Sequence, residues 1–165
     1  MKDALKTLGI LAMGLFVAII VYPFLHETGH TIATVLAGAK VIEFNLWPIP
    51  SILCNAIGIT TGGLVIIGFG GTVFPILISL ILPRKWFFVW YLKALLQGIS
   101  MLALCVSFVS VLFKVNLHDD MFQVLKFWSY GEASLLLLLS GGMAFLLSLI
   151  LRERPGRRIC DFFEL

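Results

Sequence analysis

The chain has 165 residues, of which 60% are hydrophobic and only 13% are charged, and its mean hydropathy is +1.05. A soluble domain needs about twice that share of charge to cover its surface, so we expect one integral membrane domain over residues 1–165. The net charge of +3 does not indicate nucleic-acid binding, because the basic residues flank apolar segments instead of forming a patch.

Four long apolar segments are expected to span the membrane as helices. They cover about residues 5–37, 64–82, 86–113 and 133–151. Each is close to or longer than the roughly 20 residues that a helix needs to cross the hydrocarbon core. Pro23 is expected to bend the first helix because it lacks a backbone donor. Lys93 is near enough to the start of the third for its amino group to reach the membrane surface.

Residues 40–63, between the first and second helices, have a different character. Pro48 and Pro50 exclude a helix interior, and the residues at 57–61 are largely β-branched. We therefore predict short strands or a β-hairpin at the membrane surface. The fold class that follows is an all-α membrane protein of about four transmembrane helices with this small strand region.

Positive charges orient the predicted spans. Lys2 and Lys6 precede the first helix, Arg84 and Lys85 separate the second from the third, and a basic tail occupies residues 152–165. Because positively charged segments stay in the cytoplasm, we expect a multi-pass protein of the cell membrane with both termini cytoplasmic. The end of the first helix and the loop after the third then lie on the same, non-cytoplasmic side.

The first apolar segment ends in the sequence His26-Glu27-Thr28-Gly29-His30. On an α-helix, residues four apart return to within about 40° of one another, so both imidazoles can hold one metal ion. Glu27 projects beside that ion, where a carboxylate can accept a proton from water. Ionisable groups inside a membrane helix cost at least ~2.5–3.5 kcal/mol each, so we prefer a metal site over a hydrogen-bonded polar patch.

Two histidines do not complete a catalytic zinc site, which usually has three protein ligands and an open position. The candidates for the third ligand are His118, Asp119, Asp120 and Glu132. The two aspartates also suit the start of a short amphipathic helix at about 121–128, where acidic side chains cap the backbone. One aspartate can cap this helix while the other binds metal, and we prefer Asp120 as the ligand.

The chain resembles the site-2 protease family of intramembrane zinc metalloproteases, especially its small members made of the membrane core alone. The resemblance covers about residues 8–123 and is carried by HETGH at 26–30, GGTVFP at 70–75 and the acidic motif NLHDD at 116–120. It implies one Zn²⁺ ion held by His26, His30 and Asp120. Peptide-bond hydrolysis by zinc-activated water would then use Glu27 as general base.

The substrate implied by the resemblance is a transmembrane or membrane-anchored protein in the lipid bilayer. The strand region at 40–63 could receive it as an added strand, because main-chain hydrogen bonds bind without demanding one sequence. A homo-oligomer or a regulatory membrane partner stays open. Two other functions also stay open, namely a non-catalytic membrane metal-binding protein or chaperone and a metal transporter. The carboxylate of Glu27 favours the enzyme, because a transporter does not need it beside the first ligand.

Overall fold

The structure, a computed structural model, describes residues 2–45, 50–115 and 119–163. It is 77% helical, and four of its helices are long and apolar enough to span a membrane. A small antiparallel sheet of two strands lies between the first and second of these spans. The predicted fold class is thus confirmed, and the architecture is that expected of a multi-pass membrane protein.

The first span is one continuous helix made of three parts, α1 (Lys2–Phe16), η1 (Val17–Val21) and α2 (Tyr22–Leu36). In η1, a π-helical turn, the Tyr22 amide donates to the carbonyl of Val17, five residues back. Pro23 follows directly and offers no amide to the carbonyl four residues before it, which favours a wider turn at this point. The distortion predicted at Pro23 is therefore a π turn that precedes it.

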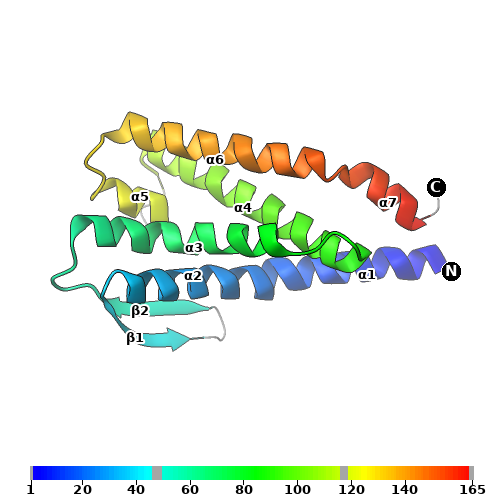
Figure 1. Cartoon of the computed structure of the whole chain (residues 1–165), viewed down its shortest axis with the longest axis horizontal. Helices are drawn as coiled ribbons and strands as arrows, with labels where there is room; N and C mark the ends of the chain where they lie inside the picture. The colour runs from blue at the N-terminus through cyan, green and yellow to red at the C-terminus, as the bar shows by residue number, and fades with distance from the viewer. Residues whose placement is uncertain (1, 46–49, 116–118, 164–165) are drawn as a thin grey trace.

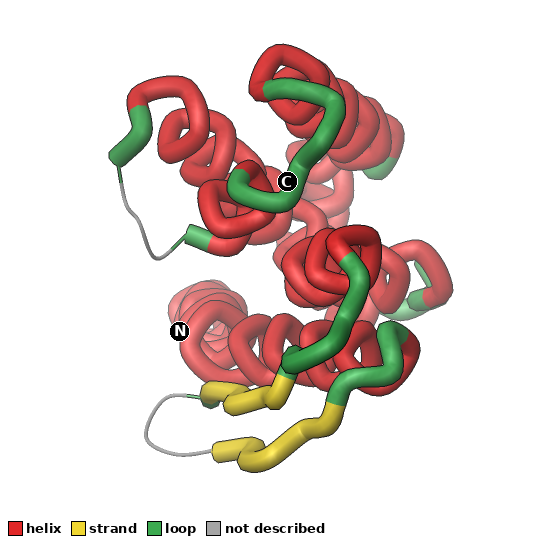
Figure 2. Tube along the Cα trace, turned by 90° about the vertical axis from the view of Figure 1, so that its left-hand side faces the viewer, coloured by secondary structure: helices red, strands yellow, loops and turns green. Residues whose placement is uncertain are grey.

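The predicted hairpin consists of β1 (Lys40–Asn45) and β2 (Ser51–Asn55), paired antiparallel with Phe44 opposite Ile52. Figure 2 shows it along one side of the helix bundle, and in Figure 1 β2 lies between β1 and α2. The strands end before 57–61, because Gly58 turns the chain with a φ of 81°. Thr60 then caps the next helix by accepting from the amide of Gly63.

The remaining elements are helices: α3 (Thr61–Ile81), α4 (Phe87–Phe113), α5 (Asp120–Leu125), α6 (Glu132–Arg152) and α7 (Pro155–Phe163). In Figure 1, α2 runs beside α3 and α4 beside α6, with both termini at one end and the hairpin and α5 at the other. The short helix predicted at 121–128 is α5, which ends earlier. The basic tail, for which we predicted no helix, contains α7.

Two glycines bring α2 and α3 into close contact. A Cβ atom added to Gly29 would lie 2.2 Å from the carbonyl oxygen of Gly70, and one added to Gly70 would lie 2.6 Å from the carbonyl oxygen of Gly29. Small residues allow membrane helices to approach in this way. The contact lies within the HETGH sequence, so α3 is held directly against the helix that carries the histidines.

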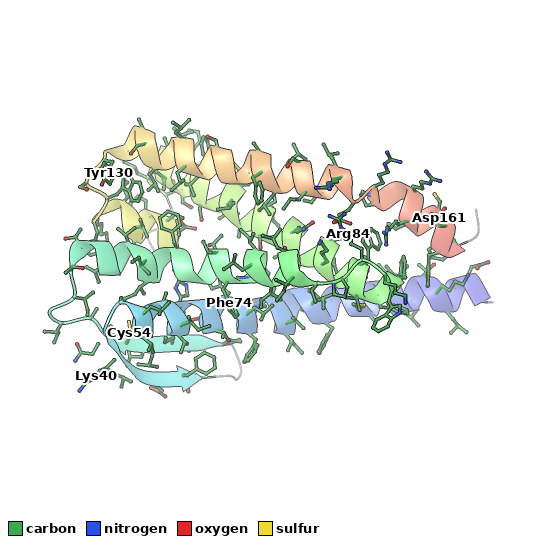
Figure 3. The ribbon with its side chains drawn as sticks, in the orientation of Figure 1. Lys40, Cys54, Phe74, Arg84, Tyr130 and Asp161 are labelled. Atoms are coloured by element: carbon green, nitrogen blue, oxygen red, sulfur yellow. The ribbon has the colours of Figure 1, made fainter. Side chains whose placement is uncertain are left out.

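Lys93, for which we expected a side chain that reaches toward the membrane surface, lies inside the protein. Its side chain is buried, and its Nζ lies 3.6 Å from Oε1 of Glu153 on α6. Arg84 approaches the same oxygen with its Nε at 2.8 Å. In Figure 3, Arg84 lies toward the end of the bundle that carries both termini, far from Cys54 on β2. The buried carboxylate thus gives Lys93 a partner of opposite charge within the protein.

Candidate metal centre

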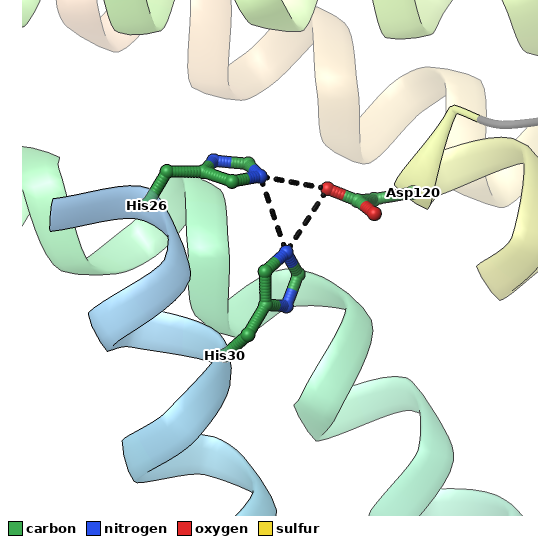
Figure 4. Close-up of side chains that lie close together, drawn as sticks. All are labelled: His26, His30 and Asp120. Carbon is green, nitrogen blue, oxygen red and sulfur yellow. Dashed lines mark hydrogen bonds and ion pairs between the residues drawn. The ribbon is translucent and has the colours of Figure 1, made fainter. Parts of the chain in front are cut away.

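Three side chains from two distant parts of the chain converge at one point (Figure 4). Nε2 of His26 lies 3.0 Å from Oδ2 of Asp120, and Nε2 of His30 lies 3.1 Å from the same oxygen. The two Nε2 atoms are themselves 3.1 Å apart. Three potential ligand atoms therefore surround a common point, and this group could hold a metal ion.

The helix and its neighbours determine how the two rings lie. His26 and His30 are one turn apart on α2, and their rings meet edge to face with centroids 4.7 Å apart. Nδ1 of His30 lies 2.7 Å from the carbonyl oxygen of Ile67 on α3, which fixes that ring. Gly71 leaves room for both rings, since a Cβ there would be 2.4 Å from Nε2 of His30.

The two adjacent aspartates have different tasks. Asp119 caps α5, because its Oδ1 accepts from the amides of Met121 and Phe122. Its Oδ2 accepts from the hydroxyl of Ser107 on α4 at 2.9 Å. With Asp119 held in this way, the first residue of α5, Asp120, turns its carboxylate toward the histidines. The structure thus has one capping aspartate and one at the candidate metal site, the arrangement the sequence predicted.

The other candidates for a third ligand lie elsewhere. Glu132 begins α6 and pairs with Lys114, their charged atoms being 3.4 Å apart. His118 and the Asn116 of the acidic motif fall outside the described residues. Asp120 is therefore the carboxylate that the described part of the chain brings to the two histidines.

The surroundings of Asp120 favour its charged form. Burial alone would raise the pKa of this carboxyl group, but the hydrogen bonds with His26 and His30 and the positive charge of these rings outweigh it. The net effect holds the pKa of Asp120 well below its usual range. The group is thus an anion at neutral pH and suited to a cation.

Glu27 lines a cleft of about 380 Å³ that also reaches His30 and Asp120. The cleft is bounded by α2, α3, α5 and β2, and the Ile52 backbone of β2 lies beside the Glu27 carboxyl group. A second cavity, of about 430 Å³, reaches His26 and Asp120 from the side of α4. The three converging side chains therefore lie between two cavities. The cavity that contains Glu27 is also lined by the strand β2.

Sequence reasoning found His26, Glu27, His30 and Asp120 but missed the residues that support them. Gly71 belongs to the GGTVFP sequence at 70–75, to which we gave no role at the metal site, and it lies against the histidine rings. Ser107 had no local signal, because its partner Asp119 is on another element. Such supporting contacts depend on the packing of distant segments and cannot be read from spacing alone.

Among protein-family models, curated proteins and solved structures, none matches this chain. The geometry of the site is therefore the basis on which a function can be inferred.

Proposed function

We propose that this chain is an intramembrane zinc metalloprotease, similar in kind to the site-2 proteases. One observation carries the proposal: an HExxH helix that is apolar enough to span a membrane meets the carboxylate of Asp120 at both of its histidines. We place the protein in the cell membrane with both termini in the cytoplasm, on the charge pattern of its loops.

The three side chains fit a zinc ion. Zinc binds nitrogen and oxygen ligands at about 2.0–2.1 Å, and tetrahedral geometry then separates neighbouring ligand atoms by about 3.3 Å. The separations of 3.0 and 3.1 Å between the Nε2 atoms and Oδ2 of Asp120 are close to this value. Two histidines and one carboxylate are also an established set for catalytic zinc. Bound there, zinc would act as a Lewis acid on water and on a peptide carbonyl.

Glu27 would be the general base. Its carboxylate shares the cleft with His30 and Asp120, so it can accept a proton from water that attacks a peptide bond in this cleft. It can then return the proton to the leaving amine. The anionic Asp120 and the two imidazoles would hold the ion, which leaves the proton transfer to Glu27.

The hairpin would bind the substrate, a transmembrane or membrane-anchored protein. Within the described residues, β2 is paired on one side with β1, and it also lines the Glu27 cleft. A substrate segment that unwinds to an extended form could add to the other edge of β2. Its peptide bonds would then run past Glu27.

Replacing Glu27 with Gln tests the enzyme. Removing a general base typically costs about 10²–10⁴-fold in rate, so Glu27→Gln should abolish a membrane-protein fragment that the unmodified protein releases, while bound zinc stays. Glu132→Gln, which removes a carboxylate outside the site, is the matched control. Equal fragments from unmodified and Glu27→Gln protein, or a purified protein without zinc affinity, would contradict the proposal.

A metal transporter is the second candidate, because cavities reach the three ligand side chains from two sides. Zinc flux into proteoliposomes separates the two functions. Flux that Glu27→Gln leaves intact would favour transport, whereas cleavage without flux supports the protease.

A further inference from the structure

The two histidines differ in what their second ring nitrogen contacts. Nδ1 of His30 lies 2.7 Å from the Ile67 carbonyl oxygen. Nδ1 of His26 is buried and has no hydrogen-bond partner within the described residues. A histidine that binds metal nearly always donates its other N–H to an acceptor that fixes the ring. His30 has this partner in the protein, and His26 lacks it in the part of the chain that the structure covers.

Further unpaired polar atoms lie close to His26, where α2 faces α4. Tyr22, one turn before His26, stacks on its ring with centroids 6.2 Å apart. The Tyr22 hydroxyl lies near the side chain of Ser100, but it forms no hydrogen bond of good geometry with any described residue. Gln97 is one turn from Ser100 on the same face of α4. Both are fully buried, and their side-chain polar atoms also find no partner among the described residues.

The π turn brings Tyr22 into this position. Val17 and Tyr22 are five residues apart, yet both are buried in one cluster with Leu96 of α4. On a regular α-helix they would point about 140° apart. The wider π turn brings them to one face, so that Tyr22 lies against α4 with His26 one turn further on.

Buried water is the natural partner for these groups. Five polar atoms are shielded from solvent here, namely Tyr22 Oη, His26 Nδ1, Ser100 Oγ and both side-chain polar atoms of Gln97. Each buried polar atom without a hydrogen bond would lower the stability of the folded state. Buried polar groups that lack a protein partner are usually bonded to ordered water. The 430 Å³ cavity that reaches His26 also touches Ile99 and Ala103, which lie on the same stretch of α4 as Gln97 and Ser100.

We propose that Tyr22, Gln97 and Ser100 hold ordered water between α2 and α4, and that this water accepts from Nδ1 of His26 and fixes the direction of its Nε2. The three residues are then positioning residues for a metal ligand. The inference rests on metal binding in the proposed function and does not require proteolysis.

Zinc affinity of the purified full chain, measured by competition with a chromogenic chelator, tests the role of the three side chains. Tyr22→Phe removes only the hydroxyl, and Ser100→Ala and Gln97→Leu remove the polar atoms on α4. We expect each change to weaken zinc binding by about 10- to 100-fold, the usual effect of losing a group that orients a ligand. Ser110→Ala, a buried serine on the same helix, is the matched control and should leave the affinity unchanged.

Thermal melting of the metal-free protein tests the water itself. If the cluster is hydrated, Tyr22→Phe and Ser100→Ala leave a water short of a partner and lower the melting temperature. If it is dry, removing an unpaired hydroxyl raises the melting temperature or leaves it unchanged. Zinc affinities within about twofold of the unmodified chain together with unchanged or raised melting temperatures would overturn the inference. A lack of zinc binding by the unmodified chain would instead refute the proposed function, and the melting result would still decide whether the cluster holds water.

Discussion

The carboxylates of Glu153 and Asp120 lie at opposite ends of this apolar bundle, and they differ in the partners that surround them. At the end that carries the termini, the Glu153 carboxylate is only 2% exposed and faces two cations, Arg84 and Lys93. At the other end, the Asp120 carboxylate is 36% exposed and faces two imidazoles beside a cleft. The first cluster pairs its carboxylate with two cations, whereas the second brings two imidazole nitrogens and a carboxylate oxygen to one point.

The difference separates a structural ion pair from a candidate binding site. A buried carboxylate between cations is neutralised by them, and its removal should affect folding. A carboxylate between two imidazoles at the wall of a cleft matches the set of ligands that a zinc ion takes in catalytic sites. Changes at the first cluster should therefore alter stability without altering metal binding, and changes at the second should do the reverse.

The largest effect is expected from Asp120→Asn. It keeps the shape of the side chain but removes the negative charge that faces both histidines. We expect zinc content, measured by mass spectrometry after gel filtration, to fall from about one ion per chain to almost none. Asp161→Asn on α7, at the far end of the bundle, is the control and should retain zinc. Full zinc content in Asp120→Asn protein would rule out this carboxylate as a ligand.

Glu153→Ala tests the other cluster. It leaves Lys93 buried without its carboxylate, and breaking a buried pair in this way typically costs about 3–5 kcal/mol. Unfolding in detergent should show this loss, while the protein that remains folded keeps its zinc. Combining Glu153→Leu with Lys93→Met should restore most of the stability, since both buried charges are then removed. A stable Glu153→Ala protein would show that the pair is not structural.

Gly71→Ala tests how closely α3 packs against the metal site. The new Cβ would lie 2.4 Å from Nε2 of His30 and 2.7 Å from Cε1 of His26, so both rings must move. We expect zinc binding to weaken by about 10- to 100-fold. Gly98→Ala on α4, where the new methyl group meets open space, should instead leave zinc affinity unchanged and stabilise the helix by about 0.5–1 kcal/mol. Equal zinc affinity in the two variants would contradict the packing argument.

The smallest effect is expected from Asp119→Ala. It removes the N-cap of α5, which should lower the free energy of unfolding by about 0.5–2 kcal/mol. It also removes the contacts that hold residue 119, and with it the start of the helix that carries Asp120. Zinc affinity should fall less than in Asp120→Asn. Asp119→Ser keeps a capping oxygen and should recover most of the stability in the same unfolding experiment. If Asp119→Ala instead lost all zinc while Asp120→Asn retained it, the assignment of the two aspartates would be reversed.

The spans and the histidine pair were predictable because they depend on local pattern. Long apolar runs define the membrane helices, and the spacing of His26 and His30 follows from helix geometry alone. The hairpin was predictable in outline, because Pro50 opposes a helix, but the β-branched residues at 57–61 lie after its strands. The division of roles between Asp119 and Asp120 followed from the capping preference at the start of a helix.

Other features depend on partners that the sequence does not place. Lys93 near a helix end suggested contact with the membrane surface, and only the packing of α6 brings Glu153 to it. The helix α7 was missed because its contacts are with distant elements, such as Phe162 stacked on Phe87 at 3.8 Å. The π turn was anticipated only as a bend, since proline marks a distortion without specifying its form.

The π turn has a consequence for the length of the first membrane helix. Such a turn accommodates one more residue than an α-helical turn at the same place. The helical segments before and after it therefore present the same faces to their neighbours as they would without the extra residue. Before it, the amino group of Lys6 donates to the Phe162 carbonyl at 3.0 Å, and after it the histidines face Asp120. Deleting Ala18 would remove the wide turn and leave both sets of contacts in register. The first membrane helix thus contains one residue more than a regular α-helix would need to join its contact at Lys6 to its contacts at the histidines.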